Sequence, residues 1–201
     1  MRKCLSEKML MFVPVIDLHL KKTFTASGSI TFPSSAKNIV VTIVGAGGCG
    51  GPWVLYKGDG YGGGGGGGGA YSRKNYGAAL AGATVSFVVG QAQSTVSADG
   101  GDSSFLGMKA TGGKGSSAWN NGGTGGTATG GDTNTAGRAG TAGGWGAFGT
   151  GGTGFTVNGA VYGTGATPNA YNTTSAIVNG IKSGCVFIEY DYKAKKNGTA
   201  I

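Results

Sequence analysis

The sequence predicts a mainly β fold: an antiparallel β-sandwich scaffold with an inserted bundle of polyglycine-II helices and little or no α-helix. Glycine supplies 46 of the 201 residues, and each interior glycine costs an α-helix about 1 kcal/mol relative to alanine. Short β-branched and aromatic runs are separated by turn residues, and no segment has an apolar period of about 3.6 residues. Glycine also recurs at every third position over long stretches, which is the repeat of the polyproline-II conformation.

Residues 1–22 differ in composition from the rest of the chain, and we interpret them as an N-terminal docking or strand-forming arm. The arm starts with basic residues and continues into the apolar run Met9–Ile16. A secretion signal starts in the same way, but charges interrupt this run and no small-residue cleavage site follows. The glycine-rich domain is then expected at residues 23–192, and a basic C-terminal tail at residues 193–201. Whether the arm pairs with a partner chain is left open.

The scaffold strands are expected where β-branched and aromatic residues gather between turn residues. The clearest is the buried strand Asn38–Val44, which follows a turn at Pro33–Lys37. The last strand, Cys185–Tyr192, alternates Val186 and Ile188 with more polar positions, as one face of a sheet requires. The remaining strands are expected within residues 23–32, 70–73, 83–89 and 103–110.

Three glycine tracts lie between these strands: residues 45–51, residues 62–69 and a long insert from residue 112 to 165. The second tract has no side chain on any face, so it can be surrounded on all sides as a core rod about 25 Å long. This structural glycine core comprises Gly62, Gly63, Gly64, Gly65, Gly66, Gly67, Gly68 and Gly69. The alternative is that the period arises by chance in a glycine-rich string.

The insert contains two glycine patterns with different predicted positions in the bundle. Segments that read x-Gly-Gly, such as residues 121–127, have one side-chain face and are expected at the edge with that face outward. The Gly-x-x tract 137–152 would contact the bundle along one face only. As one rod it would span about 50 Å, so we expect a turn to interrupt it.

Motifs that suggest chemistry fail on their context. Residues 45–50 match G-x-G-x-x-G after a strand, but no helix follows to place its N-terminus at a pyrophosphate. His19 is the single histidine and lies in the arm. The carboxylate pairs Asp99/Asp102 and Glu189/Asp191 are more simply turn residues and solvated strand residues. The sequence therefore predicts no enzyme, no catalytic residues and no cofactor.

Cysteine and charge exclude further classes. Cys4, Cys49 and Cys185 form no Cys-x-x-Cys pair, so we expect reduced thiols and no metal site. The net charge of +8 is spread thinly, whereas a nucleic-acid groove needs a dense stripe of Lys and Arg with aromatic residues. No apolar stretch reaches about 18 residues, so no membrane insertion by a helix is expected.

Aromatic residues in glycine-rich and turn-like contexts give the best binding signal. Rigid rings supply contact area, and small polar neighbours supply hydrogen bonds. The alternative is that individual rings close the ends of the bundle or fill contacts between subunits. The predicted receptor-contact residues are Trp119, Asn120, Asn121, Trp145, Phe148, Tyr171 and Asn172.

Several segments, taken in order, resemble the glycine-rich domain of bacteriophage tail fibre and adhesin proteins. The resemblance covers about residues 23–192. The segments are Phe24–Pro33, Val41–Gly48, polyglycine running into Ala70–Arg73, Val85–Gly90, Asp99–Phe105, Ala110–Gly115 and Gly184–Tyr190. The resemblance implies a β-scaffold with polyglycine-II helices, mounted on a fibre or tail, with receptor specificity at the tips between the glycine helices.

The resemblance also implies a function and partners. We expect a structural virion protein of a bacteriophage, a tail fibre or fibre-tip adhesin that is made in the host cytoplasm and displayed on the exterior of the particle. Its expected partners are other copies in a homotrimer, other virion proteins through residues 1–22, and a host receptor, either a glycan or an outer-membrane protein. The alternatives are a purely architectural virion component (capsid decoration, head fibre or tail adaptor) and an enzyme such as a depolymerase.

Overall fold

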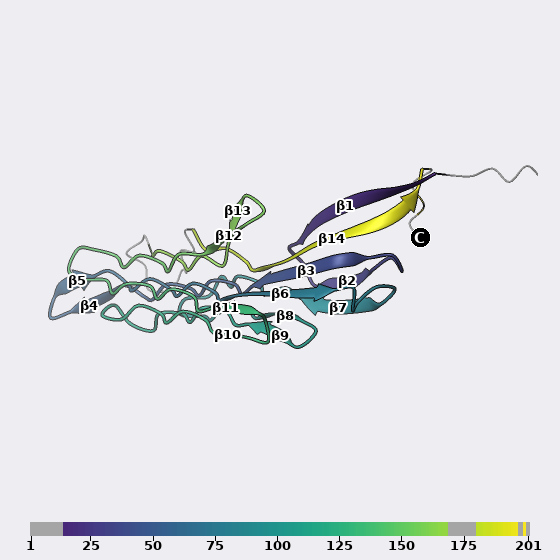
Figure 1. The fold of residues 1–201 in the computed structure, drawn as a ribbon. Coiled ribbons are helices and arrows are strands. Elements are labelled where there is room, and N and C mark those ends of the chain that lie inside the picture. The colour runs from purple at the N-terminus through teal and green to yellow at the C-terminus, as the bar shows by residue number, and fades with distance from the viewer. Residues whose placement is uncertain (1–13, 169–179, 197–198, 200–201) are drawn as a thin grey trace, which may run out of the picture.

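The computed structural model describes residues 14–168, 180–196 and 199, and it is elongated. Figure 1 shows two β-sheets at one end, where β1 begins and β14 finishes, and long rods that extend from the sheets. The hairpin of β4 and β5 lies at the opposite end of these rods. None of the described residues belongs to a helix long and apolar enough to cross a membrane.

Two antiparallel sheets form the scaffold, which confirms the mainly β class predicted from the sequence. The first sheet has the order β1 (Val15–Phe24), β14 (Cys185–Lys195), β3 (Lys37–Val44), β6 (Tyr71–Gly77) and β11 (Thr133–Thr135). The second has the order β10 (Ala128–Thr129), β9 (Met108–Ala110), β8 (Ser103–Phe105), β7 (Thr84–Val88) and β2 (Gly28–Thr31). Two separate hairpins add β4 (Val54–Tyr56) with β5 (Asp59–Tyr61), and β12 (Phe155–Val157) with β13 (Ala160–Tyr162).

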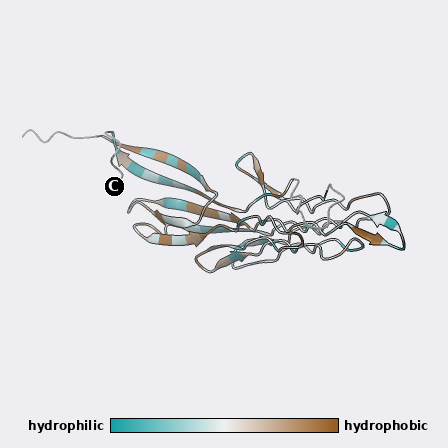
Figure 2. Ribbon diagram, turned by 180° about the vertical axis from the view of Figure 1, so that it is seen from behind, coloured by the Kyte–Doolittle hydropathy of each residue, from teal (hydrophilic) through white to brown (hydrophobic). Residues whose placement is uncertain are grey.

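The hydrophobic core lies between the two sheets, because alternate residues of each strand point inward. Figure 2 shows this alternation of polar and apolar residues along the strands. From the first sheet, β3 and β14 contribute Ile39, Val41, Ile43, Val186 and Ile188. From the second, β7, β8 and β9 contribute Val85, Phe87, Phe105 and Met108.

Two details differ from the sequence-based expectations. The segment expected as one strand at residues 103–110 is a tight hairpin of β8 and β9, because Leu106 and Gly107 adopt φ values of +33° and +77°. The expected domain boundaries after residues 22 and 192 fall inside β1 and β14, which pair along their whole length. Backbone pairing thus joins residues 15–22 and 193–195 to the scaffold, so the arm and the tail are not separate there.

The glycine tracts run as rods in which each backbone bonds to its neighbours. Residues 62–69 are the central rod and are buried throughout. The N–H groups of this rod donate to three neighbouring segments, at residues 114–118, 138–144 and 163–166. Its carbonyl groups accept from three others, at residues 48–51, 123–126 and 149–152. These bonds have N···O distances of 2.7–3.2 Å, so the rod is surrounded on six sides and most of its buried polar groups are satisfied.

Close approach explains why the central rod contains glycine alone. A Cβ atom on any residue from 62 to 69 would lie closer than 3.0 Å to a backbone carbonyl oxygen of a neighbouring rod. The neighbours change with a period of three: a Cβ on Gly65 would meet Thr150, one on Gly66 would meet Gly48, and one on Gly67 would meet Thr124. No side chain fits on any of the three faces.

The outer rods have the polarity that their sequence patterns predict. Thr124 and Thr127 of the x-Gly-Gly tract 121–127 are exposed, while Gly123 and Gly126 are buried. The turn expected within the tract 137–152 lies at residues 144–147, where Gly144 and Ala147 form a β-bridge.

Candidate functional site: the aromatic tip

Three chain segments meet at the end of the bundle that lies farthest from the sheets. They are the β4–β5 hairpin, the loop at residues 117–121 and the turn at residues 144–147. Backbone bonds join them: the Gly143 N–H donates to the Trp119 carbonyl at 2.7 Å, and the Gly146 N–H donates to the Gly60 carbonyl at 3.2 Å. A β-bridge between Tyr61 and Trp145 completes the connection. The tip is therefore ordered by the same backbone bonding as the rods.

Aromatic rings from these segments form a cluster, which we call the tip cluster: Tyr56, Tyr61 and Trp119. The Tyr61 and Trp119 ring centroids are 4.4 Å apart, and Tyr56 lies 6.0 Å from Tyr61 and 6.3 Å from Trp119. These distances are typical of favourable aromatic contacts. The two deeper rings are half-buried, while Tyr56 remains 49% exposed.

Exposed apolar side chains surround the tip cluster. Trp145 is 73% exposed and Leu55 is 66% exposed, the two highest values among the large exposed hydrophobic residues of the described chain. Lys57 and Asp59 follow in the β4–β5 hairpin, and the Lys57 Nζ atom lies 5.4 Å from the centroid of the Tyr56 ring. The tip thus exposes ring surface, in which recognition surfaces are enriched, beside charged groups of the kind found at their polar rims.

The structure brings five of the seven predicted contact residues to this end. Trp119 belongs to the tip cluster, Asn120 and Asn121 follow it and are exposed, and Trp145 is exposed on the neighbouring turn. Phe148 is half-buried beside Gly62, the first residue of the central rod. The other two, Tyr171 and Asn172, lie outside the described residues.

Leu55 and Tyr56 were not among the predicted contact residues. Their hairpin turns at Lys57 and Gly58, which have φ values of +54° and +87°. Two consecutive residues with positive φ form the type I′ turn that suits a two-residue hairpin. In the sequence, Gly58 between the apolar run 54–56 and Tyr61 was the available signal of a hairpin turn. Lysine is not a usual residue at the first turn position, so the pair Lys57–Gly58 did not predict the turn.

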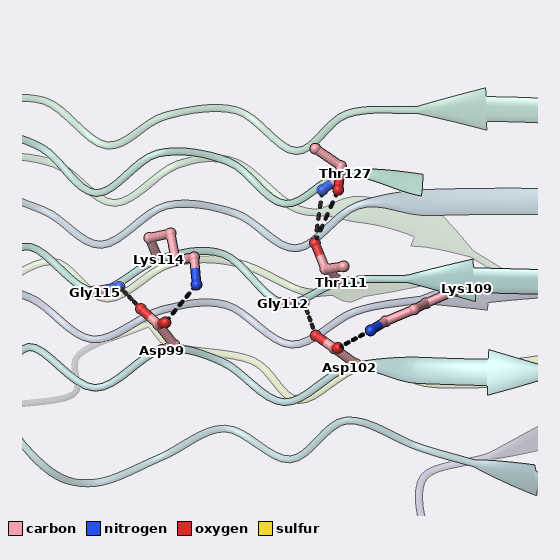
Figure 3. Close-up of polar contacts among 8 residues, drawn as sticks. All are labelled: Asp99, Asp102, Lys109, Thr111, Gly112, Lys114, Gly115 and Thr127. Atoms are coloured by element: carbon pink, nitrogen blue, oxygen red, sulfur yellow. Dashed lines mark hydrogen bonds and ion pairs between the residues drawn. The ribbon is translucent and has the colours of Figure 1, made fainter. Parts of the chain in front are cut away.

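Carboxylates at the rim of the bundle have a structural use (Figure 3). The Asp99 carboxylate accepts from the Gly115 N–H at 2.9 Å and from Lys114 Nζ at 2.7 Å. Three residues on, Asp102 accepts from the Gly112 N–H at 3.0 Å and from Lys109 Nζ at 2.8 Å. These side chains replace the carbonyl groups that a further rod would supply. They were expected in a turn; instead they follow one rod with its period of three.

The environment favours the ionised form of both carboxyl groups. The Lys114 ammonium is the main cause that lowers the pKa of Asp99, with a contribution from the Gly115 N–H. Partial burial by itself would raise the pKa of Asp102, but Lys109 and the Gly112 N–H together lower it. A glycosidase acid would instead need a raised pKa.

The remaining candidate groups are buried or paired. The G-x-G-x-x-G segment at residues 45–50 is a buried rod, and its Gly48 N–H donates to Gly67 of the central rod. Burial raises the pKa of the Cys185 thiol to about 12 and also raises that of Cys49. His19 on β1 lies 2.6 Å from Asp191. Across the described ranges, no group of three or more His, Cys, Asp or Glu residues could hold a metal ion.

The architecture defines a β-scaffold domain that carries a polyglycine-II bundle. The sequence model of a family described as a glycine-rich domain matches residues 23–199. The chain therefore belongs to this glycine-rich domain family, as identified from the ordered segments of the sequence. A search of curated proteins found no match to the chain.

Proposed function

We propose that this chain is a structural virion protein of a bacteriophage, a tail fibre or fibre-tip adhesin that contacts the host surface through its aromatic tip. The observation that carries the proposal is the position of Trp145, Leu55 and Tyr56. Leu55 and Tyr56 lie on β4, Trp145 forms a β-bridge with Tyr61 of β5, and all three side chains are exposed. Several large apolar side chains exposed next to one another indicate a binding surface more than they indicate an ordinary solvent-exposed surface.

The rods supply the rigidity that such a surface needs. Binding loses affinity when loops must be ordered at the interface. Here the tip segments are already joined to each other and to the central rod, because the Gly62 N–H donates to the Gly144 carbonyl at 3.0 Å. A preorganised tip with exposed rings and the neighbouring Asn120 and Asn121 suits either a glycan or an outer-membrane protein.

The sheet end is then the attachment side. It carries the start of β1 and the end of β14, so it faces away from the tip. In the proposed virion, residues 1–22 contact other fibre or tail proteins and further copies of the chain assemble beside it, with a homotrimer as the arrangement implied by the resemblance. We assign the protein no catalytic activity.

Paired alanine variants test the tip. Trp145→Ala and Tyr56→Ala should each reduce binding of the purified full chain to susceptible cells, or its competition with phage adsorption, by at least tenfold, since central aromatic residues dominate interfaces. Val161→Ala on β13 is the matched control, because Val161 is 47% exposed but lies away from the tip. Unchanged binding by both tip variants would reject the receptor role. Truncation of residues 112–165 is unsuitable, because these residues supply most neighbours of the central rod.

A purely architectural role is the second candidate, and one observation favours it. Tyr61 and Trp119 pack on each other and are half-buried, so part of the tip closes the end of the bundle. Labelling the chain with antibodies in intact particles separates the two: a head or inner-tail position supports an architectural role, and a distal fibre position supports an adhesin. A depolymerase would in addition release sugar from host polysaccharide, which we expect this protein not to do.

A further inference from the structure

Strand β1 leaves a long edge of the first sheet open. It contains 10 residues, Val15–Phe24, and pairs with β14 residue by residue without a bulge. Its other edge has no strand partner in the part of the chain that the structure describes. Soluble proteins usually shorten, twist or cover such edges, because the free N–H and C=O groups can pair with another strand.

Strand β1 also exposes more apolar side chains than is usual for an edge strand without a partner. Val15, Ile16 and Leu18 are 46%, 41% and 36% exposed. Leu18 and Leu20 lie opposite Tyr192 and Tyr190 of β14 and share the core side of the sheet, where Leu20 packs at the margin of the core. Leu18 therefore continues the core face beyond the part that the second sheet covers. A strand paired to the free edge of β1 would extend this face, and its side chains would cover Leu18 from the side.

The opposite face of β1 carries a charge pattern that complements itself. Asp17, His19 and Lys21 lie at alternate positions on the outer face. When two copies of β1 pair antiparallel about His19, Asp17 of each lies opposite Lys21 of the other, and Leu18 lies opposite Leu20. Pairing about Asp17 or about Lys21 would instead place like charges opposite each other, which is destabilising. Pairing about Leu18 or Leu20 forms no Asp–Lys pair.

Within the chain, the same charges lie beside opposite charges of β14: Asp17 is the cross-strand partner of Lys193, and Lys21 is that of Glu189. Asp17 Oδ1 also lies 3.6 Å from Lys37 Nζ, with the two side chains 68% and 50% exposed. Ion pairs between exposed side chains contribute little, so these contacts do not prevent Asp17 and Lys21 from pairing with a second copy. His19 is held by the Asp191 carboxylate of its own chain, which offsets any charge where the two His19 side chains meet.

We propose that β1 is the interface between two copies of this chain. The two first sheets join by antiparallel pairing of β1 with β1 about a two-fold axis at His19. In this isologous arrangement the two bundles point in opposite directions and the aromatic tips lie at the two ends of the dimer. The inference does not rest on the proposed function: it assigns residues 15–22 to contact between copies, in place of the contact with other fibre or tail proteins proposed above for residues 1–22. The homotrimer implied by the resemblance is a competing outcome of the same experiment.

Cysteine cross-linking of the full chain tests the pairing. In a Cys4→Ser background, the buried Cys49 and Cys185 should not react. His19→Cys should form a disulfide-linked dimer under mild oxidation, because directly opposed residues of antiparallel strands have Cα atoms about 4.5–5.5 Å apart. Lys37→Cys, exposed on β3 away from the edge, is the matched control and should stay monomeric on a denaturing gel.

Two further measurements fix the register and the role of charge. Asp17→Cys mixed with Lys21→Cys should cross-link well, while each variant alone should not. By sedimentation, Asp17→Lys should weaken the dimer roughly tenfold, since two cross-strand charge pairs become repulsive, and Lys21→Asp should weaken it for the same reason. Each change also places a like charge opposite Lys193 or Glu189 of its own β14. An equal mixture of the two variants keeps that internal change but restores both Asp–Lys pairs between chains, so it should dimerise like the parent. A monomeric or trimeric parent chain, or failure of His19→Cys to cross-link, would overturn the proposal. Loss of dimerisation with intact tip binding would leave the proposed function standing.

Discussion

The two ends of this molecule are stabilised by opposite means. In the sandwich, side chains such as Phe87, Phe105 and Ile188 fill the space between the sheets and are almost completely buried. In the bundle, the backbones themselves are in contact, and the central rod has no side chain beyond hydrogen. The sandwich therefore depends on apolar area removed from water, whereas the bundle depends on hydrogen bonds and close approach of peptide groups.

This difference changes which substitutions are tolerated. Ordering a glycine costs about 0.5–1 kcal/mol more than ordering an alanine, so replacement by alanine would stabilise a rod if space allowed. The neighbouring carbonyl groups remove that space at every position from 62 to 69. The same chemical change is therefore harmful in the rods and harmless in an open turn.

The largest effect is expected from Gly66→Ala. Its Cβ would overlap the Gly48 carbonyl, a backbone group that cannot move without shifting a rod. We expect a loss of about 4 kcal/mol or more, or failure to fold. Gly144→Ala is the matched control, because nothing lies within 4 Å of its Cβ, and its stability should change by less than about 1 kcal/mol. Urea unfolding measures both; equal midpoints would refute the tight-rod account.

Phe105→Ala tests the sandwich, where buried side chains stabilise the fold. Phe105 is 1% exposed and its ring lies 5.9 Å from Tyr76 and 6.5 Å from Phe87. Deleting the ring should destabilise the protein by about 3–4 kcal/mol through lost burial and a cavity. Thermal unfolding should then show that adding one carbon to the bundle is at least as damaging as removing a ring from the sandwich. A clearly larger loss for Phe105→Ala would reverse that ranking.

Acid should weaken the rim where Asp99 and Asp102 bond to the rod. Because the folded pKa of each carboxyl group is lowered from 3.8, their contribution is present above that value and is lost as the pH falls through the folded pKa. Asp99→Asn with Asp102→Asn keeps an acceptor oxygen but removes the charge. The parent should be more stable by about 1 kcal/mol at pH 7, and urea midpoints of the two proteins should converge as the pH falls through the lowered pKa values of the folded state. A gap that is constant with pH would contradict the charge argument.

The smallest effect is expected at Thr111, which is half-buried beside the edge of the bundle. Its Oγ1 accepts from the Thr127 N–H at 2.7 Å. Thr111→Val removes this acceptor, but Thr127 is exposed, so water replaces most of the bond. We expect a loss of about 0.5 kcal/mol, with Thr111→Ser as a control that retains the hydroxyl. Calorimetry that shows a loss as large as for the aspartate pair would mean that the rim depends more on hydroxyl groups than on charge.

Local periodicity made the rods predictable from the sequence. Glycine at every third position fixes which face can approach a neighbour, so the exposed Thr124 and Thr127 follow from spacing alone. The length of the tract 137–152 predicted that a turn interrupts it, but not that the turn lies at residues 144–147. Hairpins without a standard turn sequence were harder to predict from the sequence. The turn at Leu106–Gly107 has a leucine with positive φ, which sequence propensity disfavours, and a single strand was expected there.

By itself, the sequence determined that the chain forms β-strands and polyglycine-II rods, because both depend on repeats of two or three residues within one segment. The tertiary structure decided which six segments surround the central rod, since any glycine backbone can bond to any other. It also decided that Trp119 joins Tyr56 and Tyr61 of the β4–β5 hairpin in one cluster, although it comes from a separate segment. Their meeting depends on rod length and order around the bundle, which are properties of the packed assembly of rods and not of any one segment.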